Sequence, residues 1–167
     1  YISRVIPDES TIFLELQTQG LDSAGLTPLQ YTRQSGTHFF EENYTKFRLS
    51  GFSYTYLGYN LKNPKFRDRR VRQALNYAVD KNEIIKIILL GLGRVANGPF
   101  VPESWAYNPH VKAATFDPAF SKKLLSDCGW VDSDSDGWLD KGGEVFEFTI
   151  ITNQGNEERA RAAEVIQ

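Results

Sequence analysis

Helix-start signals recur along the whole chain and alternate with strand-like segments. Asp8, Asp68 and Asp80 each stand before a run with helical apolar spacing, and so do the pairs Thr27-Pro28 and Asp117-Pro118. Between these starts lie β-branched or aromatic runs that predict strands, at 2–6, 52–61 and 145–152. This interleaving predicts an α/β or mixed α+β fold.

The ends of the predicted helices carry their own signals. Gly20 is placed to stop the first helix, and Gly91 to close a helix that runs from Lys81 to about Leu90. Gln30 stands three residues after Thr27, which is the capping-box spacing. The segment 32–51 is polar and weakly patterned, so no element is predicted there, and a last helix is expected to follow Asn153–Asn156.

Length and composition limit the function classes. The 167 residues suit one domain, and a net charge of −2 gives no overall attraction to nucleic acid or anionic lipid. The single cysteine, Cys128, excludes an internal disulfide framework and a multi-thiolate metal site. The chain has no methionine and begins with a strand-like segment at Tyr1, so we expect an excised piece of a longer protein.

An acidic turn is the sharpest local motif. It reads D-x-D-x-D-G-x-x-D, formed by Asp132, Asp134, Asp136, Gly137 and Asp140. Alternating carboxylates can wrap a calcium ion, and the glycine permits a sharp turn. Position twelve is Gly143, however, where an EF-hand requires a bidentate glutamate. Two readings stay open, a solvated turn and a weak structural calcium site with Asp132, Asp134, Asp136 and Asp140 as ligands.

Signals for catalysis or nucleic-acid binding are weak. His38 and His110 lie in unrelated polar segments, and no histidine is near Cys128. Gly91-Leu92-Gly93 lacks the third glycine and the preceding strand of a dinucleotide-binding turn. The basic run from Lys62 to Arg72 begins an amphipathic helix, with Asp68 as an available ion-pair partner. We therefore predict a protein that is not an enzyme and does not bind nucleic acid.

Three local features favour ligand binding. Gly58 leaves a gap on an aromatic segment, where a ligand backbone could approach. The helix start at Thr27 offers backbone N–H groups. The corner from Asn153 to Arg159 combines amides and a guanidinium at the end of a predicted strand. Some of the many tyrosines and tryptophans, Trp105 among them, could line a cleft.

The order and spacing of several motifs resemble extracytoplasmic solute-binding proteins of family 5, the peptide/nickel-type binding components of ABC importers. The motifs are Tyr56-Leu57-Gly58-Tyr59-Asn60, Phe66-Arg67-Asp68, Val71-Arg72-Gln73-Ala74-Leu75, Ala78-Val79-Asp80-Lys81, Gly98-Pro99, Trp105-Ala106-Tyr107, Asp117-Pro118, Gly129-Trp130 and Thr152-Asn153-Gln154-Gly155-Asn156. The upstream Ile6-Pro7-Asp8 and Leu26-Thr27-Pro28 are also similar to this family.

The resemblance implies a periplasmic-binding-protein type II-like fold, of which this chain is the lobe distal to the termini. Residues 1–167 would form a single lobe, with 1–51 hinge-proximal and 52–167 the lobe body. The solute would bind in an inter-lobe cleft faced by eight candidate residues: Thr27, Tyr56, Gly58, Asn60, Trp105, Asn153, Arg159 and Arg161. Either Arg159 or Arg161 would bind a carboxylate of the solute.

As a function we expect an importer's binding component that closes on an oligopeptide or related solute by hinge motion. Its partners would be the solute and a membrane permease, and it would be a monomer outside the cytoplasm, periplasmic or lipid-anchored. No cofactor is expected apart from the possible structural calcium. The alternative is a calcium-stabilised structural or adhesion module built on the turn from Asp132 to Asp140.

Overall fold

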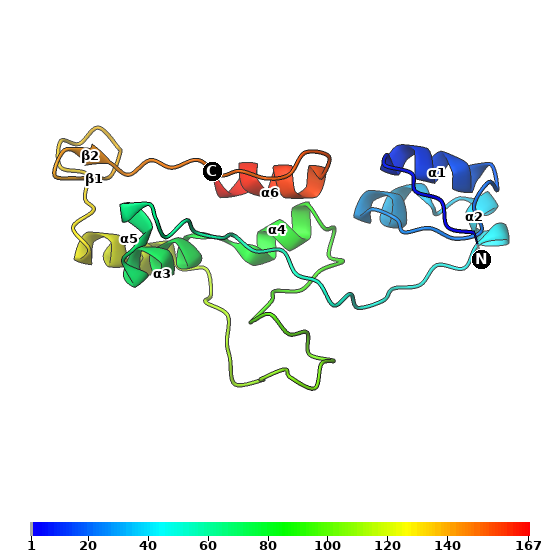
Figure 1. Cartoon of the computed structure of the whole chain (residues 1–167), viewed down its shortest axis with the longest axis horizontal. Coiled ribbons are helices and arrows are strands. Elements are labelled where there is room, and N and C mark those ends of the chain that lie inside the picture. Colours follow the sequence, from blue (N-terminus) through cyan, green and yellow to red (C-terminus); the bar gives the residue numbers. More distant parts are fainter. Residues whose placement is uncertain (1) are drawn as a thin grey trace. The chain divides into compact units, whose positions relative to one another are not determined.

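The computed structural model describes residues 2–167. Its elements are, in chain order, α1 (Glu9–Gln17), the π-helical turn η1 (Gln30–Gln34), α2 (His38–Asn43), the 3-10 turn η2 (Pro64–Phe66), α3 (Arg69–Ala78), α4 (Lys81–Ile87), α5 (Pro118–Asp127), β1 (Asp140–Lys141), β2 (Glu144–Val145) and α6 (Glu157–Ile166) (Figure 1). Strands β1 and β2 pair antiparallel.

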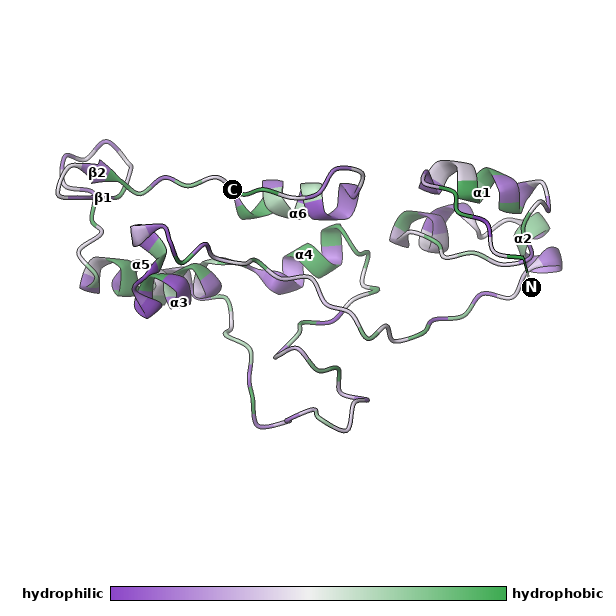
Figure 2. Cartoon of the chain, viewed as in Figure 1, coloured by the Kyte–Doolittle hydropathy of each residue, from purple (hydrophilic) through white to green (hydrophobic). Residues whose placement is uncertain are grey.

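The chain divides into two compact units. One combines the segment through Gly51 with Ile85–Gly93, and the other combines Phe52–Ile84 with Arg94–Gln167. The single-lobe assignment and its boundary at 51/52 stay predictions. Apolar and polar residues are mixed within the helices (Figure 2), and none of the helices in residues 2–167 has the length and hydrophobicity that a membrane span requires.

The predicted helix starts are confirmed by their caps. The Asp8 carboxylate accepts a hydrogen bond from Thr11 N at 2.6 Å, and that of Asp117 accepts from Phe120 N at 2.9 Å. Asp68 caps α3 and Asp80 caps α4 in the same way. These side chains satisfy backbone N–H groups that the first helical turn leaves without partners, so a local sequence signal suffices to place the helix.

The two predicted glycines do close their helices, although the helical residues end before them. Helix α1 ends at Gln17, and the residue in the left-handed conformation is Gln19 (φ 56°), one position before the predicted Gly20. Gly20 N instead donates to Glu15 O at 2.7 Å, which closes the end of the helix. Helix α4 ends at Ile87 rather than near Leu90, and Gly91 closes it as predicted: Leu90 and Gly91 are both left-handed (φ 49° and 79°), and Gly91 N donates to Ile85 O at 3.0 Å.

Helix α2 was missed because its stability comes from packing. Thr37 precedes it without a side-chain cap, so the local sequence carries no start signal. Phe40 of α2 is 3% exposed, and its ring stacks on Phe13 of α1 at 5.2 Å. Phe13, Leu16 and Phe40 form the buried core of the first unit. Tertiary contact thus selects a helix that propensity alone does not.

The predicted strands are mostly not formed. Residues 2–6 and 52–60 have no regular secondary structure, and of 145–152 only Val145 belongs to a strand. A strand exists only when a neighbouring segment pairs with its backbone, and within residues 2–167 the ladder pairs are confined to β1, β2 and one bridge between Val131 and Asp140. The alternation of apolar residues therefore predicted segments without helix correctly, but it did not predict whether another strand pairs with them.

The second unit is built around helices α3 and α5. Its buried hydrophobic residues come from η2, from these two helices and from the turn after α5: Phe66, Val71, Ala74, Leu125, Cys128 and Trp130. Tyr59 and Phe148 both contact the Phe66 ring, at 5.4 and 5.3 Å between ring centroids. The extended segments around these two residues are thereby fixed to the core, which positions the candidate ligand residues before and after them.

Candidate functional site

Residues 56–60 of the extended segment 52–60 alternate in exposure. Leu57 and Tyr59 are partly buried, whereas Tyr56, Gly58 and Asn60 are exposed. Alternate residues of an extended chain point to opposite sides, so the three predicted ligand residues share the open side. Tyr56 is 73% exposed, and this side presents a tyrosine ring, a glycine and an amide to solvent.

Tyr54 belongs to the same face and was left out of the predicted site residues. Its ring lies 5.6 Å from that of Tyr56, tilted by 40°. A Cβ atom at Gly58 would lie 3.2 Å from Cε2 of Tyr56, so the glycine lets the tyrosine ring lie against the backbone. The period-two spacing of residues 54, 56 and 58 was the signal that could have identified Tyr54.

Asn60 ends this face in a turn. Its Oδ1 accepts from Lys62 N at 3.1 Å, and its backbone O accepts from Asn63 N at 3.0 Å. The side-chain oxygen is therefore used to shape the turn into η2, and the Nδ2 group is the part of Asn60 suited to donate to a ligand.

The predicted corner before α6 does bring Asn153 and Arg159 together. Arg159 Nη1 donates to Asn153 Oδ1 at 2.9 Å, while Asn156 caps α6 by accepting from Arg159 N at 2.8 Å. A guanidinium has five N–H groups, so Arg159 is oriented by this bond and retains donors for a carboxylate. Arg161 instead faces Glu157 one turn away, at 3.6 Å in an exposed ion pair.

Thr27 forms the predicted capping box. Its Oγ1 accepts from Gln30 N at 3.2 Å, and Gln30 Oε1 accepts from Thr27 N at 3.0 Å. The buried Gln30 side chain also donates from Nε2 to Glu9 O at 3.1 Å. The threonine hydroxyl thus has a structural role, and its predicted contact with a ligand stays a prediction.

Trp105 lies in the coil between α4 and α5, and its side chain is 98% exposed. The structure gives it no contact with the other predicted ligand residues within the described chain. Its ligand role also stays a prediction.

The acidic turn gathers three of its four predicted metal ligands. Carboxylate oxygens of Asp132, Asp134 and Asp136 lie within 4.8 Å of one another, and all three side chains are exposed. The fourth, Asp140, lies outside this group, because its Oδ2 accepts from Ser133 N and Oγ at 3.0 and 2.7 Å. The Ser133 hydroxyl and amide also lower the pKa of Asp140.

Calcium binding at this turn remains a prediction with a direct test. Calcium is expected to raise the melting temperature of chelator-stripped protein by a few degrees, since ten times the dissociation constant adds about 1.4 kcal/mol. Asp134→Asn should abolish the shift, and Asp22→Asn, at an exposed aspartate elsewhere, should preserve it. No heat in calorimetry and no melting shift would leave the turn as a solvated loop.

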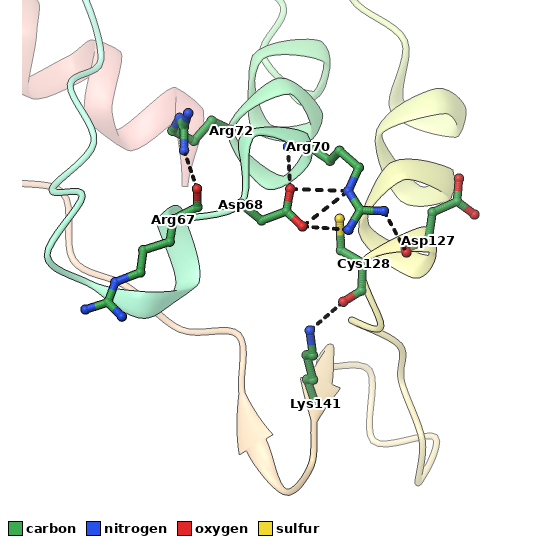
Figure 3. Close-up of polar contacts among 7 residues, drawn as sticks. All are labelled: Arg67, Asp68, Arg70, Arg72, Asp127, Cys128 and Lys141. Carbon is green, nitrogen blue, oxygen red and sulfur yellow. Dashed lines mark hydrogen bonds and ion pairs between the residues drawn. The ribbon is translucent and has the colours of Figure 1, made fainter.

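Asp68 and Arg70 together link the start of helix α3 to the end of α5. Asp68 Oδ2 accepts from Arg70 Nη2 at 2.7 Å, and Arg70 Nη1 donates to the backbone oxygen of Asp127 at 3.3 Å (Figure 3). These bonds confirm Asp68 as the ion-pair partner expected within the basic run. Hydrogen bonds from Arg70 hold the pKa of Asp68 well below its usual range. Burial, reinforced by Asp68, raises the pKa of the Cys128 thiol.

Asp68→Ala is expected to lower the free energy of unfolding at pH 7 by about 1–2 kcal/mol, because α3 loses its N-cap. The pKa of Asp68 is lower in the folded than in the unfolded state, so its ionic stabilisation is complete above pH 3.8, the ordinary value, and is lost as the pH falls below it. Urea unfolding at pH 7 and pH 3 should show the gap to wild type narrowing at acid pH. Asp22→Ala, at an exposed aspartate outside this cluster, is the control. An equal gap at both pH values would contradict the assignment.

The sequence of residues 2–167 matches the model of the bacterial extracellular solute-binding proteins, family 5 Middle. The chain belongs to this family. The resemblance and the fold class expected from the motifs are thereby confirmed, since solved structures of the family are similar over nearly the whole chain. Because the family consists of solute-binding proteins, it supports that role rather than a calcium-dependent adhesion module.

Individual family members show the extent of the similarity. The oligopeptide-binding protein AppA of Bacillus subtilis is 35% identical over 169 residues, which cover 98% of this chain and 30% of AppA. Its structure with a nonapeptide superposes with a TM-score of 0.79. NikZ of Campylobacter jejuni, in complex with Ni(L-His), gives a TM-score of 0.85 at 32% identity and covers 98% of this chain and 32% of NikZ. The chain thus spans about a third of the length of these relatives.

Proposed function

We propose that the whole protein is the binding component of an ABC importer, which takes up an oligopeptide or a related small solute. The observation that carries this proposal is the match to AppA along 98% of this chain, together with the nonapeptide bound in the AppA structure. The solute is held between two lobes that close by hinge motion and is then delivered to a membrane permease. The protein acts as a monomer outside the cytoplasm, either free or lipid-anchored.

The candidate ligand residues have complementary chemistry. The exposed face of Tyr56, Gly58 and Asn60 offers an aromatic ring, close backbone approach and an amide donor. Arg159, oriented by Asn153, offers a guanidinium to a carboxylate. Arg161 and Thr27 contribute less in this proposal, because a nearby glutamate and a helix cap already engage their polar groups.

A metal chelate is the second candidate ligand. NikZ with Ni(L-His) superposes with the higher TM-score, although AppA has the higher sequence identity. Both a peptide and L-histidine carry a carboxylate, so a guanidinium such as Arg159 suits either ligand. A binding experiment must therefore include both.

The test is ligand binding by the full-length protein after unfolding and refolding to remove bound solute. Calorimetry with mixed oligopeptides and with Ni²⁺ plus L-histidine is expected to show binding of peptide. Arg159→Ala should weaken that binding at least tenfold, while Arg69→Ala, at an exposed arginine of α3, should leave it unchanged. Binding of the nickel complex alone would favour the second candidate, and binding of neither would overturn the proposal.

A further inference from the structure

The coil between α4 and α5 contains Asn97-Gly98, the one Asn-Gly pair in the sequence. The side-chain amide of an asparagine can be attacked by the backbone nitrogen of the next residue. A glycine in that next position favours the attack, because it has no side chain to crowd the nitrogen and its backbone reaches conformations that other residues avoid. Asn97 is therefore the asparagine of this chain whose neighbour least hinders the reaction.

The structure leaves both reacting groups of this pair available. Asn97 is partly buried and Gly98 is exposed, and both lie in a bend without helix or strand. Within residues 2–167, neither the Gly98 N–H nor the side-chain amide of Asn97 takes part in a hydrogen bond. A helix or a paired strand would hold such an N–H group in a hydrogen bond. The attack at Asn97 therefore breaks no hydrogen bond of the folded protein.

The pair Asp136-Gly137 in the acidic turn provides a comparison, because an aspartate before glycine can form the same ring. Here both reacting groups are held. Gly137 N donates to Asp132 Oδ2 at 3.1 Å, and Asp136 Oδ1 accepts from Trp138 N at 2.8 Å. Ring formation at Asp136 must break these hydrogen bonds, so folding protects this site and leaves Asn97 open.

We propose that Asn97 is a site of spontaneous deamidation in the folded protein. The nitrogen of Gly98 forms a bond to Cγ of Asn97 and gives up its proton, and the side-chain nitrogen leaves as ammonia, which closes a succinimide ring. Water then opens the ring at either carbonyl, so the product is aspartate or isoaspartate at position 97. Water is the only co-reactant, and no group is oxidised or reduced.

The products change a loop that an ion pair closes. Arg94 Nη1 and Nη2 donate to Glu103 Oε1 and Oε2 at 3.0 and 2.5 Å, and both side chains are about half exposed (48%). Arg94 is the one cation among residues 94–103, so a carboxylate at position 97 competes with Glu103 for it. Isoaspartate also lengthens the backbone inside the loop. Deamidation is thus expected to weaken the Arg94–Glu103 pair.

The test is incubation of the full-length protein at mildly alkaline pH, followed by peptide mass spectrometry at each asparagine and at Asp136. Aspartate and isoaspartate should appear first at position 97. Gly98→Ala should slow this reaction severalfold and keep the fold, because an added Cβ meets no atom within 4 Å and Gly98 is not left-handed. Gly36→Ala, at another glycine with open space, is the control and should leave the rate unchanged.

A parallel incubation in urea separates the sequence from the structure. Unfolding should speed ring formation at Asp136 severalfold and change the rate at Asn97 little. A rate at Asn97 that is much lower in the folded protein than in urea would overturn the proposal, and so would earlier deamidation at another asparagine. An equal rate in wild type and Gly98→Ala would show that the Gly98 nitrogen is not the attacking group. The reaction does not involve the solute, so these results are independent of the proposed function.

Discussion

Replacing Trp130 by alanine is expected to lower the free energy of unfolding by about 3–5 kcal/mol, the usual loss for a large aromatic removed from a core. Trp130 is 6% exposed and meets the Phe146 ring edge-to-face at 4.7 Å. The ammonium group of Lys141 lies 5.9 Å from the centroid of its ring, and the same group donates to Cys128 O at 2.7 Å (Figure 3). The substitution therefore leaves a cavity and also loosens the attachment of the β1–β2 hairpin to α5.

Urea unfolding of the full-length protein, followed by circular dichroism, measures this loss without relying on tryptophan fluorescence. Trp138→Ala is the matched control, because Trp138 is 61% exposed and only eight positions away. Its unfolding midpoint should stay close to that of wild type. Equal losses in the two variants would show that the hydrophobic cluster around Trp130 does not limit stability.

The second large effect is expected for Phe40→Ala in the first unit, also about 3–5 kcal/mol. Phe40 stacks on Phe13 and has further ring contacts with Phe39 at 5.5 Å and Tyr44 at 5.6 Å. Because α2 lacks a side-chain cap, this packing is its main source of stability, so the helix should be lost with the ring.

Hydrogen exchange resolves this effect by segment. Amides of residues 38–43 should lose protection in Phe40→Ala, and those of α5 in the second unit should keep it. Phe47→Ala, at a phenylalanine that is 70% exposed, should leave both sets unchanged. Retained protection across α2 would show that the helix does not depend on the Phe40 ring.

Local signals were sufficient for the helix starts and insufficient for the sheet. A cap such as Asp117 acts on an amide three residues away, so the sequence contains the whole interaction. Strand pairing joins distant segments, and alternation in 52–61 reveals which residues share a face without revealing a partner. Helix α2 was missed for the same reason. It is stabilised by a contact between residues distant in sequence, because Phe40 stacks on Phe13, which lies 27 positions earlier.

In the candidate site, too, the sequence predicted contacts within one short segment better than other contacts. The spacing of Asp132, Asp134 and Asp136 places three carboxylates together because one short turn contains them all. Asp140 departs from the group because it begins a strand and bonds to Ser133, which the spacing could not reveal. The bond between Arg159 and Asn153 joins residues of one corner and was accessible to sequence reasoning, whereas the Arg94–Glu103 pair was not predicted.

Hydrogen bonds to helices α3 and α4 fix the C-terminal end of the coil between α4 and α5. Lys81 Nζ donates to Ala114 O at 3.2 Å and to Asn76 O at 2.9 Å, and Asp117 N donates to Tyr77 O at 2.9 Å. Burial lowers the pKa of Lys81. Doubling the length of a closed loop costs only about 0.6 kcal/mol. Residues inserted after Asn108 would therefore leave helices α3 and α5 in place, so this coil can change in length and sequence at little cost to folding.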